Sequence, residues 1–248
     1  MIASPGGGFG SRIFRMTKSK TLLSIASLVY PPTPFLNVIP KNCRRDIHAA
    51  IFCKGYRVLD VGSGITKGPG DWLWTASRDP SVTIVRLDII DGPGIDIVAD
   101  ATDLPDIGKF DAVVLQSVPE HVRDIGKLFK SIKAVLKTGG IIYVEMPFLQ
   151  GVHGDPYDFW RCTLDGLETI IGSPKVVLKG VSGGPIGALI WIVSDLVSNI
   201  TPYKTINFLL RFIVRWVLAV FRYLDFILYK TQASQRLACE YYILSQNN

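Results

Sequence analysis

An acid and two glycines stand at the end of one apolar run, and they are the residues most able to do chemistry. The run 58–61 contains Asp60 and is followed by Gly62 and Gly64. Glycine allows positive φ and a close approach of a ligand, and open α/β sheets bind nucleotide-like cofactors at the carboxyl end of the first strand. A dinucleotide turn, G-x-G-x-x-G, would need glycine where Lys67 stands. The spacing disfavours a nicotinamide oxidoreductase and favours a cofactor with an amino-acid end, whose ammonium would pair with Asp60.

The elements that must position this turn alternate along the chain. From Tyr56 onward, short β-branched runs alternate with helical segments, as in a doubly wound α/β sheet. Strands are expected near 56–61, 82–88, 96–99, 110–115, 140–146, 175–180 and 240–246. The helix after Pro119 has the clearest pattern, because its apolar residues recur on one face. We expect Gly139 and Gly140 to end it.

The segment from about Gly55 to Gly172 resembles class I S-adenosylmethionine (SAM)-dependent methyltransferases of the methyltransferase type 11 group, and residues 240–245 resemble the last strand of their fold. The resemblance implies a Rossmann-like, doubly wound, seven-stranded sheet whose last strand is antiparallel. It also implies SAM as the cofactor. The cofactor-binding turn would comprise Asp60, Gly62, Ser63 and Gly64, which would hold the methionine part of SAM, and Thr66 replaces the third glycine of the family.

Two more acids belong to the predicted cofactor site. By resemblance, Asp88 accepts the ribose hydroxyls, although a strand-end cap is the alternative role. Asp100 would meet the adenine amino group, with the backbone at Ala101 beside the ring edge, and Ile89 could cover one adenine face. Asp103 is expected instead to be a helix N-cap.

The fourth predicted strand ends with Gln116, which would lie beside the cofactor at the carboxyl edge of the sheet. The loop after it lacks the N-P-P-Y motif of certain amino-group methyltransferases, which argues against nucleobase amines as acceptors. Glu120 follows at the expected head of the next helix. A carboxylate is favoured at a helix N-terminus on electrostatic grounds alone, so a structural role is expected for Glu120.

The loop after the fifth strand carries the candidate catalytic residues. Residues 153–163 resemble an H-x-x-P-x-D-x-x-R-x-T stretch of a bacterial subgroup, and they lie where an acceptor should enter. His153 could take a proton from a hydroxyl acceptor because its ordinary pKa lies near neutral pH, or it could be structural. Asp158 and Arg161 are the other two candidates, and an ion pair between them could equally brace the loop.

Composition limits the possible partners. Residues 1–54 hold eight Lys/Arg and one acid, whereas the remainder holds nineteen Lys/Arg and twenty acids. The basic arm could be solvated or could meet anionic lipid. It lacks the interleaved aromatic residues of a nucleic-acid-binding surface, so no nucleic acid is expected. The four cysteines are scattered and no metal-ligand spacing is visible, which indicates a reducing compartment and no metal.

The chain is expected to have three parts: a basic, proline-rich N-terminal segment (1–40), a SAM-binding domain (41–181 and 237–248) and a hydrophobic insertion (182–236). The apolar stretch 21–30 looks a little like a signal peptide, but it is too short to span a membrane and no small-x-small cleavage site follows it. We expect residues 1–20 to be disordered, and Met16 could be an alternative start.

The insertion suggests a membrane partner. A helix is expected from about 204 to 229, on which Lys204, Arg211, Arg215, Arg222, Asp225 and Tyr229 form a stripe of about 80°. A narrow cationic stripe on a broad apolar helix is typical of a helix lying in a membrane interface, with arginines reaching lipid phosphates. Packing on the sheet or on a second subunit is the alternative, and the oligomeric state is left open.

These observations predict a SAM-dependent methyltransferase that is peripheral on the cytoplasmic face of a membrane. The acceptor would be a hydroxyl of a small molecule or of a lipid-linked or surface glycan. The alternative hypothesis is a non-catalytic protein that keeps the SAM-binding fold and uses the amphipathic helix as a partner interface.

Overall fold

The computed structural model describes residues 31–34, 36–64, 71–76, 78–154, 157–173 and 175–247. The predictions for residues 1–30, Thr66 and Lys67 lie outside the described residues. The chain forms two compact units. We name the one comprising Val38–Phe148, Phe159–Ser182 and Glu240–Asn248 the sheet unit, and the one comprising Met1–Asn37, Leu149–Asp158 and Gly183–Cys239 the hairpin unit.

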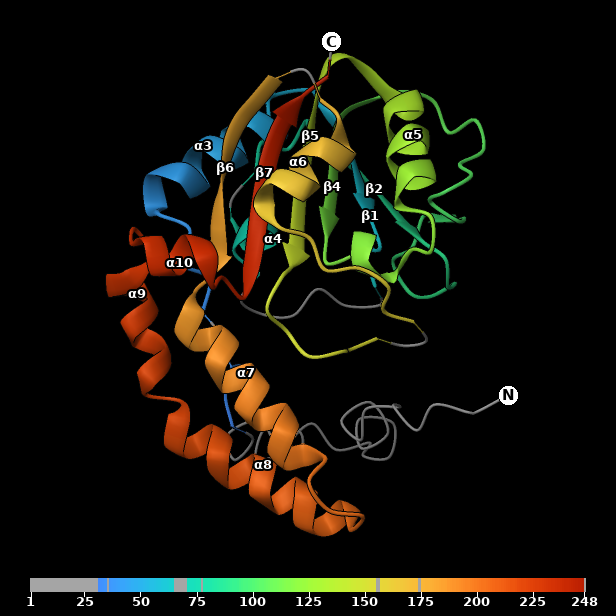
Figure 1. Cartoon of the computed structure of the whole chain (residues 1–248). Coiled ribbons are helices and arrows are strands. Elements are labelled where there is room, and N and C mark those ends of the chain that lie inside the picture. Colours follow the sequence, from blue (N-terminus) through green and yellow to red (C-terminus); the bar gives the residue numbers. More distant parts are fainter. Residues whose placement is uncertain are drawn as a thin grey trace. The chain divides into compact units, whose positions relative to one another are not determined.

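The sheet unit contains a seven-stranded mixed sheet, and all seven predicted strands are found (Figure 1). The strands are β1 (Arg57–Val61), β2 (Thr83–Asp88), β3 (Ile97–Val98), β4 (Phe110–Gln116), β5 (Leu136–Pro147), β6 (Lys175–Gly183) and β7 (Glu240–Gln246). Their order is β3-β2-β1-β4-β5-β7-β6. The first five strands are parallel to one another, and β7 is antiparallel to β5. The predicted doubly wound, Rossmann-like fold is confirmed.

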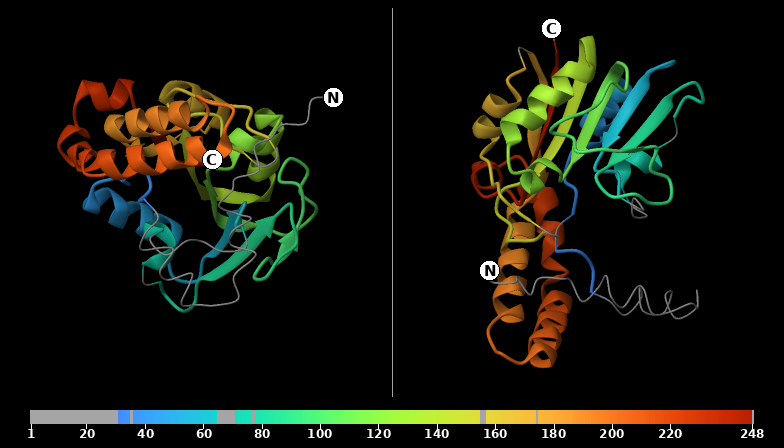
Figure 2. Two further views of the ribbon diagram at one scale, coloured as in Figure 1. Left: turned by 90° about the horizontal axis from the view of Figure 1, so that it is seen from below. Right: turned by 90° about the vertical axis from the view of Figure 1, so that its right-hand side faces the viewer.

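Helices cover both faces of this sheet. Because successive side chains of a strand point to opposite faces, the buried strands supply two separate cores. One core joins Val58 and Val114 to α3 (Lys41–Ile51) and α4 (Trp72–Thr75). The other core joins the alternate positions of the same strands to α5 (Ile125–Val135) and α6 (Leu164–Ile171) (Figure 2).

The helix predicted after Pro119 begins later and ends earlier than expected. A 3-10 turn, η1 (Pro119–His121), comes first, and the N-cap of α5 is Asp124, whose carboxylate accepts a hydrogen bond from the backbone of Lys127. The prediction that Gly139 and Gly140 end the helix is wrong. Leu136 is already extended and pairs with Phe110, so both glycines belong to the irregular start of β5, where Gly139 has φ +74°.

The hairpin unit is built on two helices that run side by side, α7 (Pro185–Ser198) and α8 (Lys204–Leu218) (Figures 1 and 2). Buried Asn207 closes the connection between them, because its side chain accepts from and donates to the backbone of Thr201. A 3-10 turn, η2 (Phe221–Leu224), and the short helices α9 (Asp225–Leu228) and α10 (Gln232–Arg236) follow.

The single helix predicted over 204–229 is therefore wrong, since its regular part ends at Leu218. From Val220 onward the backbone bonds tighten, and the amide of Tyr223 donates to the carbonyl of Val220. Asp225 then accepts hydrogen bonds from the amides of Ile186 and Gly187 at 2.9 and 2.8 Å. The acid of the predicted stripe thus satisfies the N-terminus of α7.

The expectation that the polar stripe faces outward is also wrong for two of its members. Arg215 is 7% exposed and Asp225 is fully buried, whereas the apolar side chains around them are open to solvent. A buried carboxylate and a buried guanidinium cannot reach lipid phosphates. In the part of the chain that the structure describes, no helix combines the length and hydropathy needed to cross a bilayer.

Candidate active site

The turn after β1 has the conformation that its glycines were expected to provide. Gly62 and Gly64 have φ of +64° and +65°. Asp60 is fully buried, and its Oδ2 accepts a hydrogen bond from the Ser63 hydroxyl at 2.8 Å. The amide of Ser63 donates to the carbonyl of Leu87, which ties the turn to β2. The four predicted residues therefore form one structured turn.

Asp88, at the end of β2, organises the same edge of the sheet. Its Oδ2 accepts the Gly64 amide at 2.9 Å and its Oδ1 accepts the Ile90 amide at 3.0 Å. The strand-end cap that was the alternative role is thus present. An ionised carboxylate offers about four lone pairs, so two backbone bonds leave acceptor capacity for hydroxyl groups. Ile89 is 66% exposed, so its side chain is open to a ligand.

Asp100, rather than Asp103, organises the turn after β3. Its Oδ1 accepts hydrogen bonds from both the amide and the hydroxyl of Thr102 at 2.8 Å, and its carbonyl accepts the amide of Asp103. The predicted N-cap role of Asp103 is wrong, because residues 101–103 form a turn and no helix begins there. Ala101 is buried at the base of this turn.

The amide of Gln116 is held from both sides. Its Oε1 accepts the indole N–H of Trp74 at 2.6 Å, and its Nε2 donates to Oε2 of Glu145 at 3.0 Å. The other oxygen of Glu145 accepts the hydroxyl of Tyr143. These contacts fix which end of the amide is oxygen and which is nitrogen. Gln116 is therefore a rigid group at the carboxyl end of β4.

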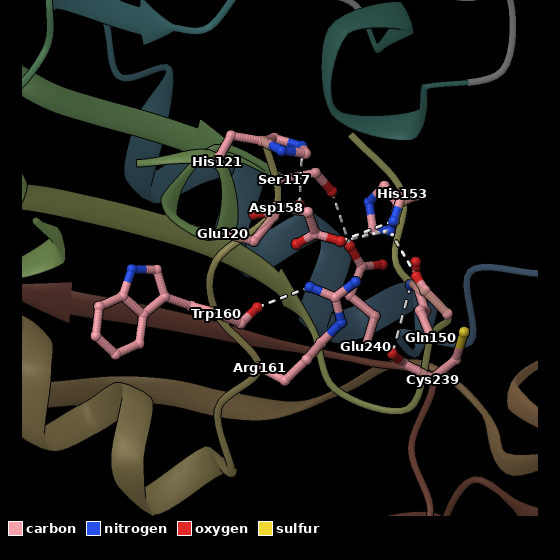
Figure 3. A network of polar contacts seen from close by, with 11 residues as sticks. Ser117, Glu120, His121, Gln150, His153, Asp158, Trp160, Arg161, Cys239 and Glu240 are labelled. Atoms are coloured by element: carbon pink, nitrogen blue, oxygen red, sulfur yellow. Dashed lines mark hydrogen bonds and ion pairs between the residues drawn. The ribbon is translucent and has the colours of Figure 1, made fainter. Parts of the chain in front are cut away.

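Buried carboxylates lie at the ends of the central strands. Glu240 accepts a hydrogen bond from the hydroxyl of Ser117 at 3.2 Å (Figure 3). It accepts another from the hydroxyl of Ser182 at 3.1 Å. Burial raises the pKa of Glu240 well above its usual range, and the nearby charges of Glu145 and Glu120 raise it further. Burial also raises the pKa of Glu145. Neighbouring buried acids of this kind favour their protonated forms.

The sequence patterns did not point to Trp74, Ser117, Tyr143, Glu145 and Glu240 as site residues. Ser117 is the one described non-glycine residue with positive φ, at +52°. A signal was available for Glu145, because a lone acid inside an otherwise apolar strand is a buried charge that needs a reason. Glu120 is buried in η1 and does not cap α5.

The catalytic candidates fall in different units. His153 and Asp158 belong to the hairpin unit, whereas Arg161 and all of the cofactor candidates belong to the sheet unit. Arg161 donates to the carbonyl of Trp160 at 2.8 Å. The ion pair expected between Asp158 and Arg161 would join the two units and stays a prediction. Asp155 and Pro156, in the same motif, lie outside the described residues.

Asp158 fixes the conformation of the loop that carries His153. The Asp158 side chain is 2% exposed and accepts the backbone N–H of His153 at 2.7 Å (Figure 3). The imidazole Nδ1 lies 3.2 Å from the carbonyl of Gly151, and the ring stacks at a tilt beside Trp191. A carbonyl can only accept, so Nδ1 donates and carries the proton. The neutral ring then presents Nε2 as its basic nitrogen.

The turn residues fit a bound nucleoside cofactor. A Cβ placed on Gly64 would meet none of the described residues within 4 Å, and Gly64 is exposed, so the backbone here is open to a ligand. Gly62 is closed by contrast, because a Cβ there would lie 2.5 Å from Cγ2 of Val118. One glycine of the motif thus serves packing and the other leaves space at the edge where Asp88 and Ile89 lie.

Comparison with known proteins agrees with this geometry. Residues 72–144 match the family model of a methyltransferase domain, Methyltransf_11. No curated protein sequence matches the chain. Among solved structures, the [4+2]-cyclase SpnF superposes with a TM-score of 0.51 at 16% identity, covering 100% of this chain and 98% of that one. Coclaurine N-methyltransferase, solved with N-methylheliamine and SAH, has a TM-score of 0.51 at 12% identity, covering 95% and 91%.

The fold and the matched domain define the class. Residues 72–144 match a methyltransferase domain, and the chain has the fold of class I SAM-dependent methyltransferases, in agreement with the class predicted from the turn at Asp60. Within that class it resembles the methyltransferase type 11 group over the segment that spans α4 to most of β5. At identities this low the structural neighbours show the fold alone, and one of them is a cyclase.

Proposed function

We propose that this protein transfers the methyl group of SAM to a hydroxyl of a small molecule or of a lipid-linked or surface glycan. The observation that carries the proposal is the edge formed by the glycine turn and Asp88, which is open at Gly64 and bonded to Asp88 through the Gly64 amide. SAM supplies a methyl group that is already activated by its sulfonium. The protein then has to bind, orient and exclude water.

Each candidate residue has a chemical task in this proposal. The cofactor-binding turn would hold the methionine end of SAM, with buried Asp60 as the anionic partner of its ammonium. Asp88 would accept the ribose hydroxyls through its remaining lone pairs. Asp100 and Ala101 would meet adenine, and exposed Ile89 would cover one face of the ring. Gln116, held by Trp74 and Glu145, would form a fixed polar wall at the end of β4.

His153 is proposed as the base that takes the hydroxyl proton. Its Nδ1 donates to Gly151, which leaves Nε2 as the proton acceptor. Asp158 is the positioning residue for the loop, since it holds the His153 amide. Arg161 is proposed to orient the acceptor or to brace the loop. The loop begins directly after β5, whose parallel neighbour β4 ends in Gln116, and this connectivity supports a role near the reacting atoms.

Cofactor binding is the first test. Calorimetric titration of the full chain with SAM is expected to give micromolar affinity, and Asp88→Ala is expected to weaken it at least tenfold, which is about 1.4 kcal/mol. NADH should give no response. Asp91→Ala is the matched control, because it removes an exposed acid three residues further on and should bind SAM like the wild type. A folded wild type that binds no SAM would overturn the proposal.

A second candidate function is a SAM-fold binding protein without catalysis. The likeness to SpnF keeps an alternative open, because this fold also occurs in a protein described as a cyclase, so the fold alone does not establish methyl transfer. An acceptor screen on membrane glycolipids separates the two functions. If turnover is found, it should fall in His153→Asn and Asp158→Asn while SAM affinity is retained. A non-catalytic protein has no turnover to lose.

We further propose that the enzyme works at the cytoplasmic face of a membrane and contacts it through residues 182–236. Six Lys/Arg and two Asp give 183–239 a net charge of +4, which complements anionic lipid. An acceptor attached to a lipid would then lie at the same surface as the enzyme.

A further inference from the structure

The outer surface of the α7–α8 hairpin is apolar over a large part of its circumference. On α8, the exposed apolar side chains are Ile206, Phe208, Leu209, Ile213, Trp216 and Val217. At 100° per residue these six cover an arc of about 180°. On α7, Leu189, Ile192 and Leu196 are exposed, and Leu196 is 62% exposed. The exposed apolar surface continues through η2 and α9 to Ile227.

Several polar residues of the same unit are buried. Ser194 of α7 and Asn207 and Arg215 of α8 are buried, as is Asp225 of α9. A water-facing hairpin has the opposite arrangement, with apolar residues between the helices and polar residues outside. We call the exposed apolar residues of α7 and α8, nine in number, the outer apolar surface.

We propose that the outer apolar surface is embedded in the acyl-chain region of one bilayer leaflet. This deepens the proposed membrane contact and rests on it, but it does not depend on the methyl-transfer proposal. It differs from the interpretation of the sequence, in which the arginine stripe faced lipid phosphates. Here the apolar arcs contact lipid, and Arg215 and Asp225 of the stripe stay buried in the protein.

Charge complementarity selects lipid over a protein partner. The exposed charged residues of this segment include Lys204 at one end of α8 and Lys230 and Arg236 beyond the other end. In the described residues of 183–239, neither of the two aspartates is exposed. An apolar surface with cations near both of its ends matches an anionic leaflet, whose phosphates lie at either side of the embedded stretch.

The lengths of α7 and α8 limit how the hairpin can be oriented in a bilayer. Helices of 14 and 15 residues are about 21 and 22 Å long, which is short of the roughly 30 Å hydrocarbon core. The connection between them contains Asn199 and Thr201 beside exposed Ile200 and Tyr203, and α8 begins with exposed Lys204. Since exposed cations lie near one end of the hairpin and beyond the other, we infer that it lies lengthwise within one leaflet, with these cations at the headgroups.

Vesicle flotation tests the proposal with matched charge changes. The first variant carries Leu209→Glu, Ile213→Glu and Val217→Glu in the outer apolar surface. The control carries the same three charges at exposed polar positions outside this arc, Asn199→Glu, Gln232→Glu and Gln235→Glu. With neutral phosphatidylcholine vesicles, we expect the wild type and the control to float and the first variant to lose at least 90% of its flotation. Anionic phosphatidylglycerol should increase wild-type flotation.

Depth is measured on Trp216. The contribution of Trp216 is the part of the tryptophan fluorescence that disappears in Trp216→Phe. Lipids with brominated acyl chains should quench this part, and bromines deep in the chains should quench it more than a brominated headgroup analogue. A wild type that does not float, or a first variant that floats like the control, would overturn the proposal. Light scattering without vesicles tests whether a second copy of the chain covers this surface instead. If the wild type is a dimer, the first variant is a monomer and neither floats, the surface is an interface between copies. SAM affinity, measured on the same samples, separates these outcomes from failure of the enzymatic proposal.

Discussion

Replacing Gly62 with alanine is expected to lower the free energy of unfolding by about 3 kcal/mol. A non-glycine residue held in the left-handed region costs on the order of 1 kcal/mol. A second cost arises because the new Cβ would lie 2.5 Å from Cγ2 of Val118, and overpacking of this kind costs about 1–3 kcal/mol. Valine is stiff at χ1, so the backbone must move. Chemical denaturation followed by circular dichroism measures the loss.

Gly64→Ala separates the two causes. Gly64 has nearly the same φ, +65°, but a Cβ there meets nothing within 4 Å, so only the backbone cost of about 1 kcal/mol is expected. In the double variant Gly62→Ala, Val118→Ala, the overpacking should be relieved. Its loss of stability should then be smaller than the sum of the losses of the two single variants, which a double-mutant cycle measures as coupling. Equal losses in the two single glycine variants, or no coupling, would show that the turn does not pack as described.

Replacing Glu240 with glutamine is expected to stabilise the protein at alkaline pH. Folding raises the pKa of Glu240 because the carboxyl is buried near Glu145 and Glu120. Above pH 4.5, the ordinary glutamate pKa, Glu240 of the unfolded state has released its proton. The folded state still binds this proton, because its pKa is higher. Stability from this group is complete below that pH and is lost as the pH rises toward the folded pKa.

The measurement is the free energy of unfolding at pH 5 and pH 8. The wild type should lose more stability between these values than Glu240→Gln, and the variant should gain on the order of 2 kcal/mol over the wild type at pH 8. A glutamine can still bond to the hydroxyls of Ser117 and Ser182. Asp91→Asn, at an exposed acid, is the control and should follow the wild type. A variant that is less stable than the wild type at pH 8 would contradict the assignment of a buried, proton-binding Glu240.

The strands and the glycine turn could be predicted because their signals are local. Apolar alternation and turn residues fix the run from Arg57 to Gly64 whatever surrounds it, and Asp88 was recognised from its place at a strand end. Helix limits were less accurate, since Leu136 joins β5 through pairing with Phe110 across the sheet. That pairing is a tertiary contact, and it overrode the helix stop expected at Gly139.

The rest of the site depends on side chains that meet from distant parts of the sequence. Gln116 is held by Trp74 and Glu145, which lie 42 and 29 residues away. Sequence spacing contains no information on such contacts. The helix periodicity of 204–229 correctly separated a polar stripe from an apolar remainder, but periodicity alone cannot say which side faces the protein. Burial of Arg215 and Asp225 decided that question.

The strand order has a consequence for how the chain is made. β7 lies between β5 and β6 in the sheet but is synthesised after both of them and after the whole hairpin. Until β7 emerges from the ribosome, the edge of β5 has unpaired backbone groups and an apolar surface, which makes it a template for wrong pairing. To pair with β5, β7 must close a loop of more than ninety residues, because β5 ends at Pro147 and β7 begins at Glu240. Slow assembly is the usual result of such long-range pairing, so a nascent chain paused within the hairpin would be open to chaperones and to aggregation.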